Sequence, residues 1–281
     1  VIQKTYICCC SKIFNMSNLL TRAISGLVYV SLFLFAILYN ANSYIALTTI
    51  FGVICIWEYS KIIQSKNIIP YLFLGGMVYF FINPIEGYSS TTTLGATITG
   101  SIILIFLLYS HKKIKYDTIF QRLFLQLIYL TLPFYFLISI PFIFGEYDPQ
   151  ILICTLIFIW VNDSFAYLVG KNFGKTKLFE SVSPKKTIEG FIGGLVFALI
   201  AAFIISKQFE NPNINLVDWL IIAAILSVFG TIGDLIESKF KRQAKVKDSG
   251  NIMPGHGGLL DRLDSLFFAA PFVYLYLYFI I

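Results

Sequence analysis

Apolar residues occur in long runs that are separated by short polar segments. An α-helix rises 1.5 Å per residue, so about 20 residues are needed to cross roughly 30 Å of hydrocarbon. The runs therefore predict an all-α, polytopic membrane protein with nine transmembrane helices. We place them near 23–39, 43–60, 68–82, 94–110, 123–144, 150–169, 188–206, 216–236 and 258–281. The third and fourth runs are the weakest, because only a modest polar segment separates them.

Composition strengthens this prediction. The 281 residues are 57% hydrophobic and only 13% charged, whereas a soluble domain carries about 25% charged residues. Apolar runs cover nearly the whole chain, so we expect a single membrane domain over 16–281, with its catalytic half at about 150–281. Residues 1–15 precede a natural-looking start at Met16 and are expected to be a non-native or disordered leader.

The distribution of charge predicts which side of the membrane each loop faces. If the N-terminus is cytoplasmic, nine spans place all but one of the 21 Lys and Arg residues on the inside, the exception being Lys207. Cytoplasmic loops carry an excess of Lys and Arg in membrane proteins. The N-terminus is therefore expected inside and the C-terminus outside.

Polar residues gather in three intervals at the predicted cytoplasmic side of the last four spans. The first, 162–194, contains Asp163 inside a predicted span. A carboxylate at that depth is costly unless it is partnered or solvated, which favours a functional role over a purely structural one. The segment 170–176 resembles a phosphate-binding P-loop, but three residues instead of four separate its glycines, and it follows a span rather than a strand. We therefore exclude a P-loop.

The second interval, 233–247, ends the eighth span. Asp234 and Glu237 are three residues apart, so they share one face of a helix. Several Lys and Arg residues follow within 239–247. Three interpretations stay open for this interval: an anchor for anionic headgroups, a solvated cluster of ion pairs, or a metal site.

The third interval, 247–265, combines glycines with acidic residues. The glycines within 255–258 allow backbone N–H groups to converge on an anion, and the N-terminus of the ninth span adds a positive dipole. Asp261 and Asp264 lie one turn apart on that span. Hard oxygen ligands of this kind suit Mg²⁺, which takes one or two carboxylates together with substrate phosphates and water. His256 is either a turn residue or a phosphate contact.

One long pattern joins the second and third intervals. It runs through Ser238-Lys239-Phe240-Lys241-Arg242, Lys247-Asp248, Pro254-Gly255-His256-Gly257-Gly258 and Asp261-Arg262-Leu263-Asp264. This pattern resembles the signature of bacterial phosphatidate cytidylyltransferases. The segments 163–177 and 183–190 are similar to that family as well, while the first five spans match only in character. Met253 and Ile188 depart from the usual family residues, and neither departure removes a polar group.

The resemblance implies a reaction and a set of site residues. Phosphatidic acid would attack the α-phosphorus of CTP, giving CDP-diacylglycerol and pyrophosphate, and catalysis would consist mainly of positioning and charge neutralisation. Mg²⁺, with a second cation beside it, would be held by Asp234 and Asp261, with Asp264 and Glu237 as further candidates. The predicted catalytic residues are Asp234, Asp261, Lys247 and Asp264. The predicted substrate contacts are Asp163, Ser183, Lys186, Thr187, Lys241, Arg242, His256 and Arg262, with Lys241 and Arg242 near the lipid phosphate.

Three other functions stay open at this point. A CTP-dependent polyprenol kinase would have a similar membrane fold and use the same nucleotide, but it would transfer the γ-phosphate to an alcohol. An archaeal-type ether-lipid cytidylyltransferase would carry out the same reaction on a lipid with a different tail. A transporter predicts charges at the bilayer midplane and repeat symmetry, whereas these charges cluster at one surface. The resemblance further implies a bacterial inner membrane location, a cytoplasmic active site, a homodimer and no nucleic-acid partner.

Overall fold

The computed structural model describes residues 2–84, 90–110, 112–209 and 211–280, with side chains from residue 20 onward. The first helices are α1 (Ile2–Tyr39), α2 (Ala41–Ile62), α3 (Ile69–Ile82), α4 (Ser90–Tyr109), α5 (Ile119–Gln126) and α6 (Leu132–Ser139). The remaining helices are α7 (Pro149–Phe173), α8 (Ile188–Gln208), α9 (Leu216–Gln243) and α10 (Leu260–Ile280). A short hairpin of β1 (Lys177–Phe179) and β2 (Ser183–Thr187) connects α7 to α8. The prediction of an all-α membrane protein is confirmed, and this hairpin is a small addition to it.

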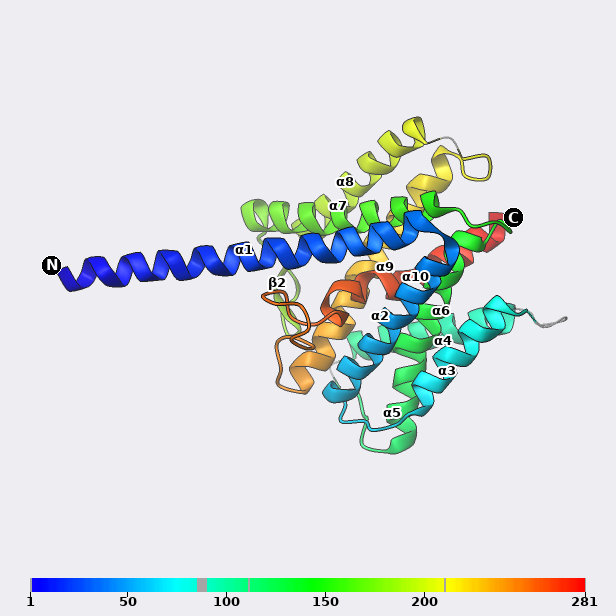
Figure 1. Ribbon diagram of the computed structural model, residues 1–281, viewed down its shortest axis with the longest axis horizontal. Helices are drawn as coiled ribbons and strands as arrows, with labels where there is room; N and C mark the ends of the chain where they lie inside the picture. Colours follow the sequence, from blue (N-terminus) through cyan, green and yellow to red (C-terminus); the bar gives the residue numbers. More distant parts are fainter. Residues whose placement is uncertain (1, 85–89, 111, 210, 281) are drawn as a thin grey trace.

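Eight helical segments in the described part of the chain are long and apolar enough to cross a membrane. One of them, Ile119–Phe142, is continuous from α5 through a π-helical turn (Leu127–Thr131) and α6 to a short 3₁₀ turn (Ile140–Phe142). The predicted span at 68–82 corresponds to α3, whose 14 residues reach only about 21 Å. The count of nine crossings and the orientation of the N-terminus therefore stay predictions, as does the leader at 1–15. In Figure 1 the two ends of the chain lie at opposite ends of the molecule.

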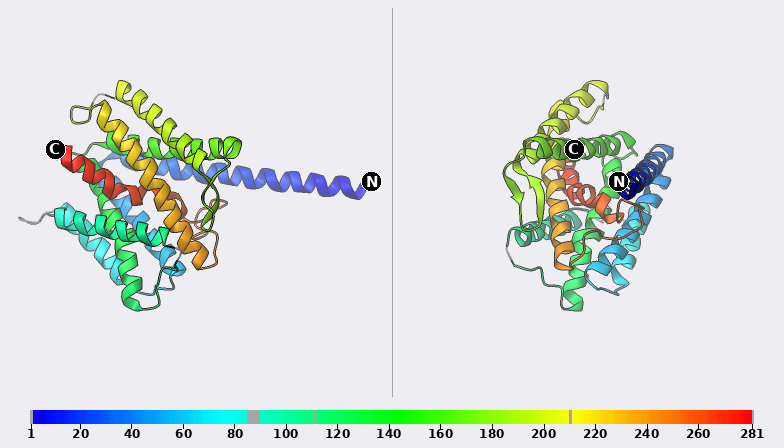
Figure 2. Two further views of the ribbon diagram at one scale, coloured as in Figure 1. Left: turned by 180° about the vertical axis from the view of Figure 1, so that it is seen from behind. Right: turned by 90° about the vertical axis from the view of Figure 1, so that its left-hand side faces the viewer.

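Helices α9 and α10 pack against each other and lie side by side in the views of Figure 2. The two helices approach closely at Gly233, where a Cβ would lie 2.7 Å from both the carbonyl oxygen of Asp264 and the Cβ of Phe268. Any larger residue would separate the two helices, because real Cβ atoms do not come that close. Small residues permit such contacts between membrane helices. The contact places the next residue of α9, Asp234, beside α10.

Helices α7 and α8 form the other closely packed pair, and the hairpin between them has a fixed base. The Thr187 hydroxyl caps α8 by accepting the N–H of Gly190 at 3.1 Å. The Glu189 carboxylate accepts the backbone N–H groups of Lys175 and Thr176, each at 3.1 Å. The segment 170–176 is thus the end of α7 and the start of a hairpin, in line with the exclusion of a P-loop.

Lys239 connects α9 to the end of α4. Its ammonium group is buried and donates to the carbonyl oxygens of Leu107, Leu108 and Ser110. Leu107 and Leu108 lie in the last turn of α4, where carbonyls have no partner within the helix, and Ser110 follows it. A cation there also complements the helix dipole. One member of the basic run at 239–247 is therefore a helix cap rather than a surface anchor.

Candidate active site

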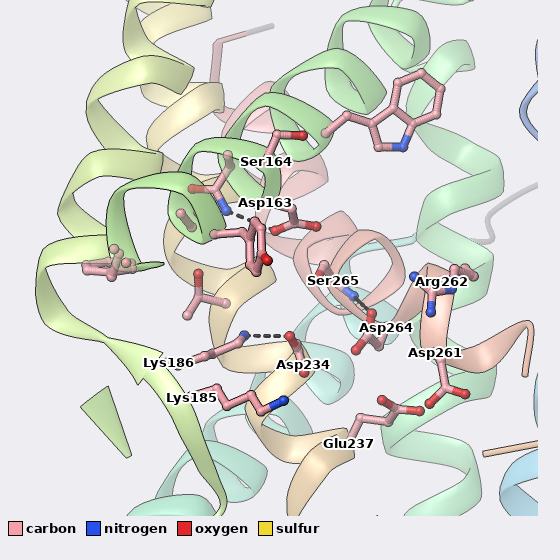
Figure 3. A pocket seen from close by; sticks show the side chains of 18 of the residues that line it. Asp163, Ser164, Lys185, Lys186, Asp234, Glu237, Asp261, Arg262, Asp264 and Ser265 are labelled. Atoms are coloured by element: carbon pink, nitrogen blue, oxygen red, sulfur yellow. Dashed lines mark hydrogen bonds and ion pairs between the residues drawn. The ribbon is translucent and has the colours of Figure 1, made fainter. Parts of the chain in front are cut away.

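A cavity of about 1060 Å³ lies among α1, α7, the hairpin, α9 and α10. Figure 3 shows acidic side chains on its α9 and α10 walls, with Lys185 and Lys186 approaching from the hairpin. All three polar intervals of the sequence contribute to this one cavity. Its lining also includes Gly26, Tyr29 and Val30 of α1, a contribution that the sequence analysis missed.

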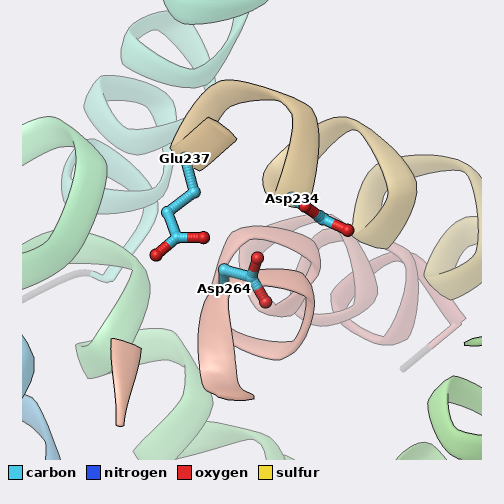
Figure 4. A group of neighbouring side chains, drawn as sticks. All are labelled: Asp234, Glu237 and Asp264. Atoms are coloured by element: carbon cyan, nitrogen blue, oxygen red, sulfur yellow. The ribbon is translucent and has the colours of Figure 1, made fainter. Parts of the chain in front are cut away.

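Three carboxylates form a compact cluster at the junction of α9 and α10. Asp234, Glu237 and Asp264 each offer one oxygen, and these oxygens lie within 4.8 Å of one another. Figure 4 shows the three side chains near one another where α9 meets α10. Glu237 is 1% exposed, and its Oε1 has no hydrogen-bond partner among the described residues. A buried oxygen without a donor is costly, so this atom is suited to an external cation.

Two lysines flank the cluster. The Lys186 ammonium lies 2.5 Å from Asp234, and the Lys241 ammonium lies 2.5 Å from Glu237 and 2.6 Å from Asp261. Burial by itself lowers the pKa of Lys186, but the Asp234 carboxylate more than offsets this, so the pKa is raised. When all groups are ionised, the four carboxylates outnumber the two ammonium groups by two charges.

Asp261 has a different environment from Asp264. One oxygen accepts from Lys241, and the other accepts the backbone N–H of Ser249 at 2.9 Å and of Gly258 at 2.8 Å. The Ser249 hydroxyl approaches the same oxygen at 3.0 Å. Asp261 lines the cavity and also holds the preceding loop, whereas the sequence paired it with Asp234 as a metal ligand. The structure places Asp264 and Glu237 beside Asp234 instead.

The backbone amides at the start of α10 are occupied by protein carboxylates. Besides the amides taken by Asp261, the N–H groups of Leu259 and Leu260 donate to Glu58 of α2 at 3.2 and 2.8 Å. The sequence analysis expected these amides to bind a substrate anion, and it did not single out Glu58. The available signal was the same as for Asp163, a carboxylate inside a predicted span.

The predicted substrate contacts divide into two groups. Asp163 lines the cavity from α7 and accepts a hydrogen bond from Asn162 at 3.2 Å. Among the described residues, Ser183, Arg242 and Lys247 do not line this cavity. Arg242, in the last turn of α9, and Lys247, in the loop after it, are exposed. Lys241, expected near the lipid phosphate, is instead buried between two carboxylates.

The loop before α10 also rests on α1. The Nδ1 atom of His256 lies 2.7 Å from the Ser25 hydroxyl, which also contacts the carbonyl oxygen of Pro254 at 3.0 Å. Arg262 donates to the carbonyl oxygen of His256 at 2.7 Å. Burial, followed by the charges of Arg262 and Arg22, lowers the pKa of His256. A neutral imidazole at the cavity wall fits a structural contact with α1.

Comparison with known proteins gives a consistent result. The family model described as "Cytidylyltransferase family" matches residues 20–280. A protein named phosphatidate cytidylyltransferase from Bacillus subtilis is 36% identical over 267 residues, which is 92% of this chain and 97% of that protein. Proteins of the same name from Staphylococcus haemolyticus and Staphylococcus aureus are 52% and 51% identical over 113 and 117 residues. Those two alignments span 40% and 42% of this chain and 43% and 45% of the relatives.

Proposed function

Because the chain belongs to the cytidylyltransferase family, we propose that it is the enzyme that transfers the cytidylyl group of CTP to phosphatidate. The observation that carries this proposal is the cavity where α9 and α10 meet, with three clustered carboxylates and two lysines. Such a cavity suits a reaction between two phosphate-bearing substrates, because both need their charge neutralised before they approach each other.

The reaction needs no covalent intermediate on the protein. A phosphate oxygen of phosphatidate forms a bond to the α-phosphorus of CTP. The bond from that phosphorus to the oxygen bridging to the β-phosphate breaks, and pyrophosphate leaves with the bonding electrons. The task of the side chains is to hold the two anions in line and to balance their charge.

We assign the divalent cation to Asp234, Glu237 and Asp264. Their oxygens lie close together, and the Oε1 atom of Glu237 lacks a donor among the described residues. Oxygen ligands of this kind suit Mg²⁺. When bound, Mg²⁺ supplies positive charge to the phosphates of the nucleotide.

Lys186 and Arg262 are the proposed phosphate contacts. Both line the cavity, and Lys186 reaches it from the hairpin, at the side opposite α10 (Figure 3). A cation bound at Asp234 would compete with the Lys186 ammonium for that carboxylate. Lys186 would then be free to contact a nucleotide phosphate. Lys241 keeps a separate role as the internal counter-ion of Glu237 and Asp261.

The lipid substrate is proposed to enter along α1 and α7. The cavity wall there contains Tyr29 and Val30 of α1 and Trp160 of α7. These side chains offer apolar surface for the first part of an acyl chain, while the phosphate lies deeper among the charged groups.

Isotope labelling tests the proposed reaction directly. Membranes that contain the protein are incubated with phosphatidate and with CTP labelled at either the α- or the γ-phosphate. Transfer of α-label to lipid, with γ-label recovered in pyrophosphate, is expected. Lipid labelled only from the γ-position would indicate a kinase. Replacing phosphatidate with an unsaturated archaeal-type ether-lipid phosphate tests the remaining alternative.

We propose that the cavity faces the cytoplasm of a bacterial cell and that the protein lies in the inner membrane. This orientation puts nearly all Lys and Arg residues inside. A reporter fused after Ile281 is expected outside, and one inserted at Lys112 inside. Both reporters on the same side would contradict the nine-span topology. The predicted homodimer is tested separately, by cross-linking in native membranes.

A further inference from the structure

Glu58 is a fully buried carboxylate on α2, far in sequence from the acidic residues of the cavity. It is 0% exposed and lies four residues before the end of α2 at Ile62. Its Oε1 accepts the N–H of Leu259 at 3.2 Å, and its Oε2 accepts the N–H of Leu260 at 2.8 Å. Oε2 also lies 3.2 Å from the Ser249 hydroxyl.

These contacts satisfy the beginning of α10. The first N–H groups of a helix have no partner within it, and they carry the positive end of the helix dipole. Glu58 supplies acceptors for Leu259 and Leu260, while Asp261 supplies them for Ser249 and Gly258. Two carboxylates from different parts of the chain thus share the donors of a single loop.

The loop is shaped around the Glu58 side chain. A Cβ at Gly250 or at Gly258 would overlap its carboxylate group. Both positions therefore need glycine for the loop to approach α2 this closely. The Ser249 hydroxyl lies between Glu58 and Asp261, at 3.2 and 3.0 Å. With one proton, it donates to only one of them at a time.

We propose that Glu58 is a positioning residue for cytidylyl transfer. It does not line the cavity, so it acts through the start of α10. By fixing Leu259 and Leu260, it sets Asp261 against Lys241 and, one turn later, Asp264 against Asp234 and Glu237. The N-terminal half of the chain therefore takes part in building the site, although its residues carry no part of the family signature.

The test uses Glu58→Gln in the full-length protein in detergent. Glutamine keeps the size, but one of its two positions becomes an NH₂ group that faces backbone N–H donors. Hydrogen exchange of the segment 249–260 is expected to be at least about tenfold faster than in the wild type, with the hairpin at 177–187 unchanged. The kcat is expected to fall at least about tenfold, with a smaller change in the KM for CTP.

Two further variants make the result decisive. Ser60→Ala is the matched control, because Ser60 is also buried on α2 and bonded to a distant residue, Gln126, at 2.8 Å. It is expected to leave exchange at 249–260 and kcat near the wild-type values. Glu58→Asp keeps both acceptor oxygens on a shorter side chain, and it is expected to recover part of the lost kcat.

The inference rests on the proposed function for its kinetic measurement only. If the wild type transfers no cytidylyl group, the proposed function fails, while exchange at 249–260 still tests the anchor. Glu58→Gln with wild-type exchange at 249–260, or with wild-type kcat, would overturn the inference. Faster exchange spread equally over α7 and α8 would also overturn it, because it would show general destabilisation.

Discussion

Two groups of carboxylates lie side by side at the start of α10, and they differ in their hydrogen bonds. Glu58 accepts two backbone N–H groups, and Asp261 accepts two backbone N–H groups and the Lys241 ammonium. The Ser249 hydroxyl lies within reach of both and donates to one of them at a time. In the other group, Glu237 has an oxygen without any hydrogen-bond partner among the described residues. Asp264 accepts one hydrogen bond from the described part of the chain, from the N–H of Ser265 at 2.8 Å.

The difference separates two roles that the sequence does not distinguish. A carboxylate whose oxygens already accept several hydrogen bonds gains little from a cation, whereas a buried, unsatisfied one gains much. Asp261 and Asp264 belong to one Asp-x-x-Asp pattern, one turn apart. We interpret the first as a loop anchor and the second as a cation ligand.

The largest effect is expected for Asp264→Asn. The substitution keeps the size but removes one of three clustered charges, so activity should fall at least about a hundredfold, the equivalent of about 2.7 kcal/mol in the barrier. Without Mg²⁺ the melting temperature should stay the same or rise, because repulsion with Asp234 and Glu237 is reduced. Mg²⁺ should stabilise the wild type against heat and this variant much less. A full Mg²⁺ response in the variant would contradict the assignment.

Asp261→Asn is the matched comparison. The single NH₂ group of asparagine would face either the Lys241 ammonium or the N–H groups of Ser249 and Gly258, all of which Asp261 now accepts. The melting temperature without Mg²⁺ is expected to fall, and activity to fall at least about tenfold. Because the cation site is intact, Mg²⁺ should still raise the melting temperature. Loss of that response, with no loss of stability, would make Asp261 the metal ligand that the sequence predicted.

Lys186 and Lys247 offer a second pair for comparison. Lys186 lines the cavity, whereas Lys247 is exposed outside it. Lys186→Gln is expected to raise the KM for CTP about tenfold, since a charge-assisted hydrogen bond to phosphate contributes about 1.5–3 kcal/mol. Lys247→Gln is expected to change it less than about twofold, within the range of a single exposed charge. Equal increases in the KM for CTP in steady-state assays would support the sequence prediction that Lys247 is a catalytic residue.

The smallest effect concerns pH and the loop before α10. The pKa of His256 is lowered by burial and then by Arg262 and Arg22. As pH falls below about 6.5, the unfolded chain binds a proton before the folded protein does, so stability declines. The wild type should lose slightly more thermal stability than His256→Gln between about pH 7.5 and about pH 5.5. Identical losses in the two proteins would contradict a lowered pKa at His256, because the other histidine is common to both.

Much of the fold was predictable from the hydrophobic pattern. Eight of the expected spans correspond to apolar helices of sufficient length, because a bilayer requires long, self-satisfied helices. The segment at 68–82 is the exception, with a helix of 14 residues. Long-range contacts were not predictable, such as Lys239 at the end of α4 or Ser25 against His256. Each of them joins residues more than a hundred positions apart.

The sequence by itself determined the family, the all-α membrane fold and the three intervals that meet in one cavity, because these depend on composition and local spacing. Only the tertiary structure decided which acids face one another. The contact at Gly233 brings Asp264 to Asp234, and the packing of α2 against α10 brings Glu58 to the start of α10. Whether a carboxylate binds a cation or a backbone amide depends on its neighbours in space, and helix packing sets those neighbours.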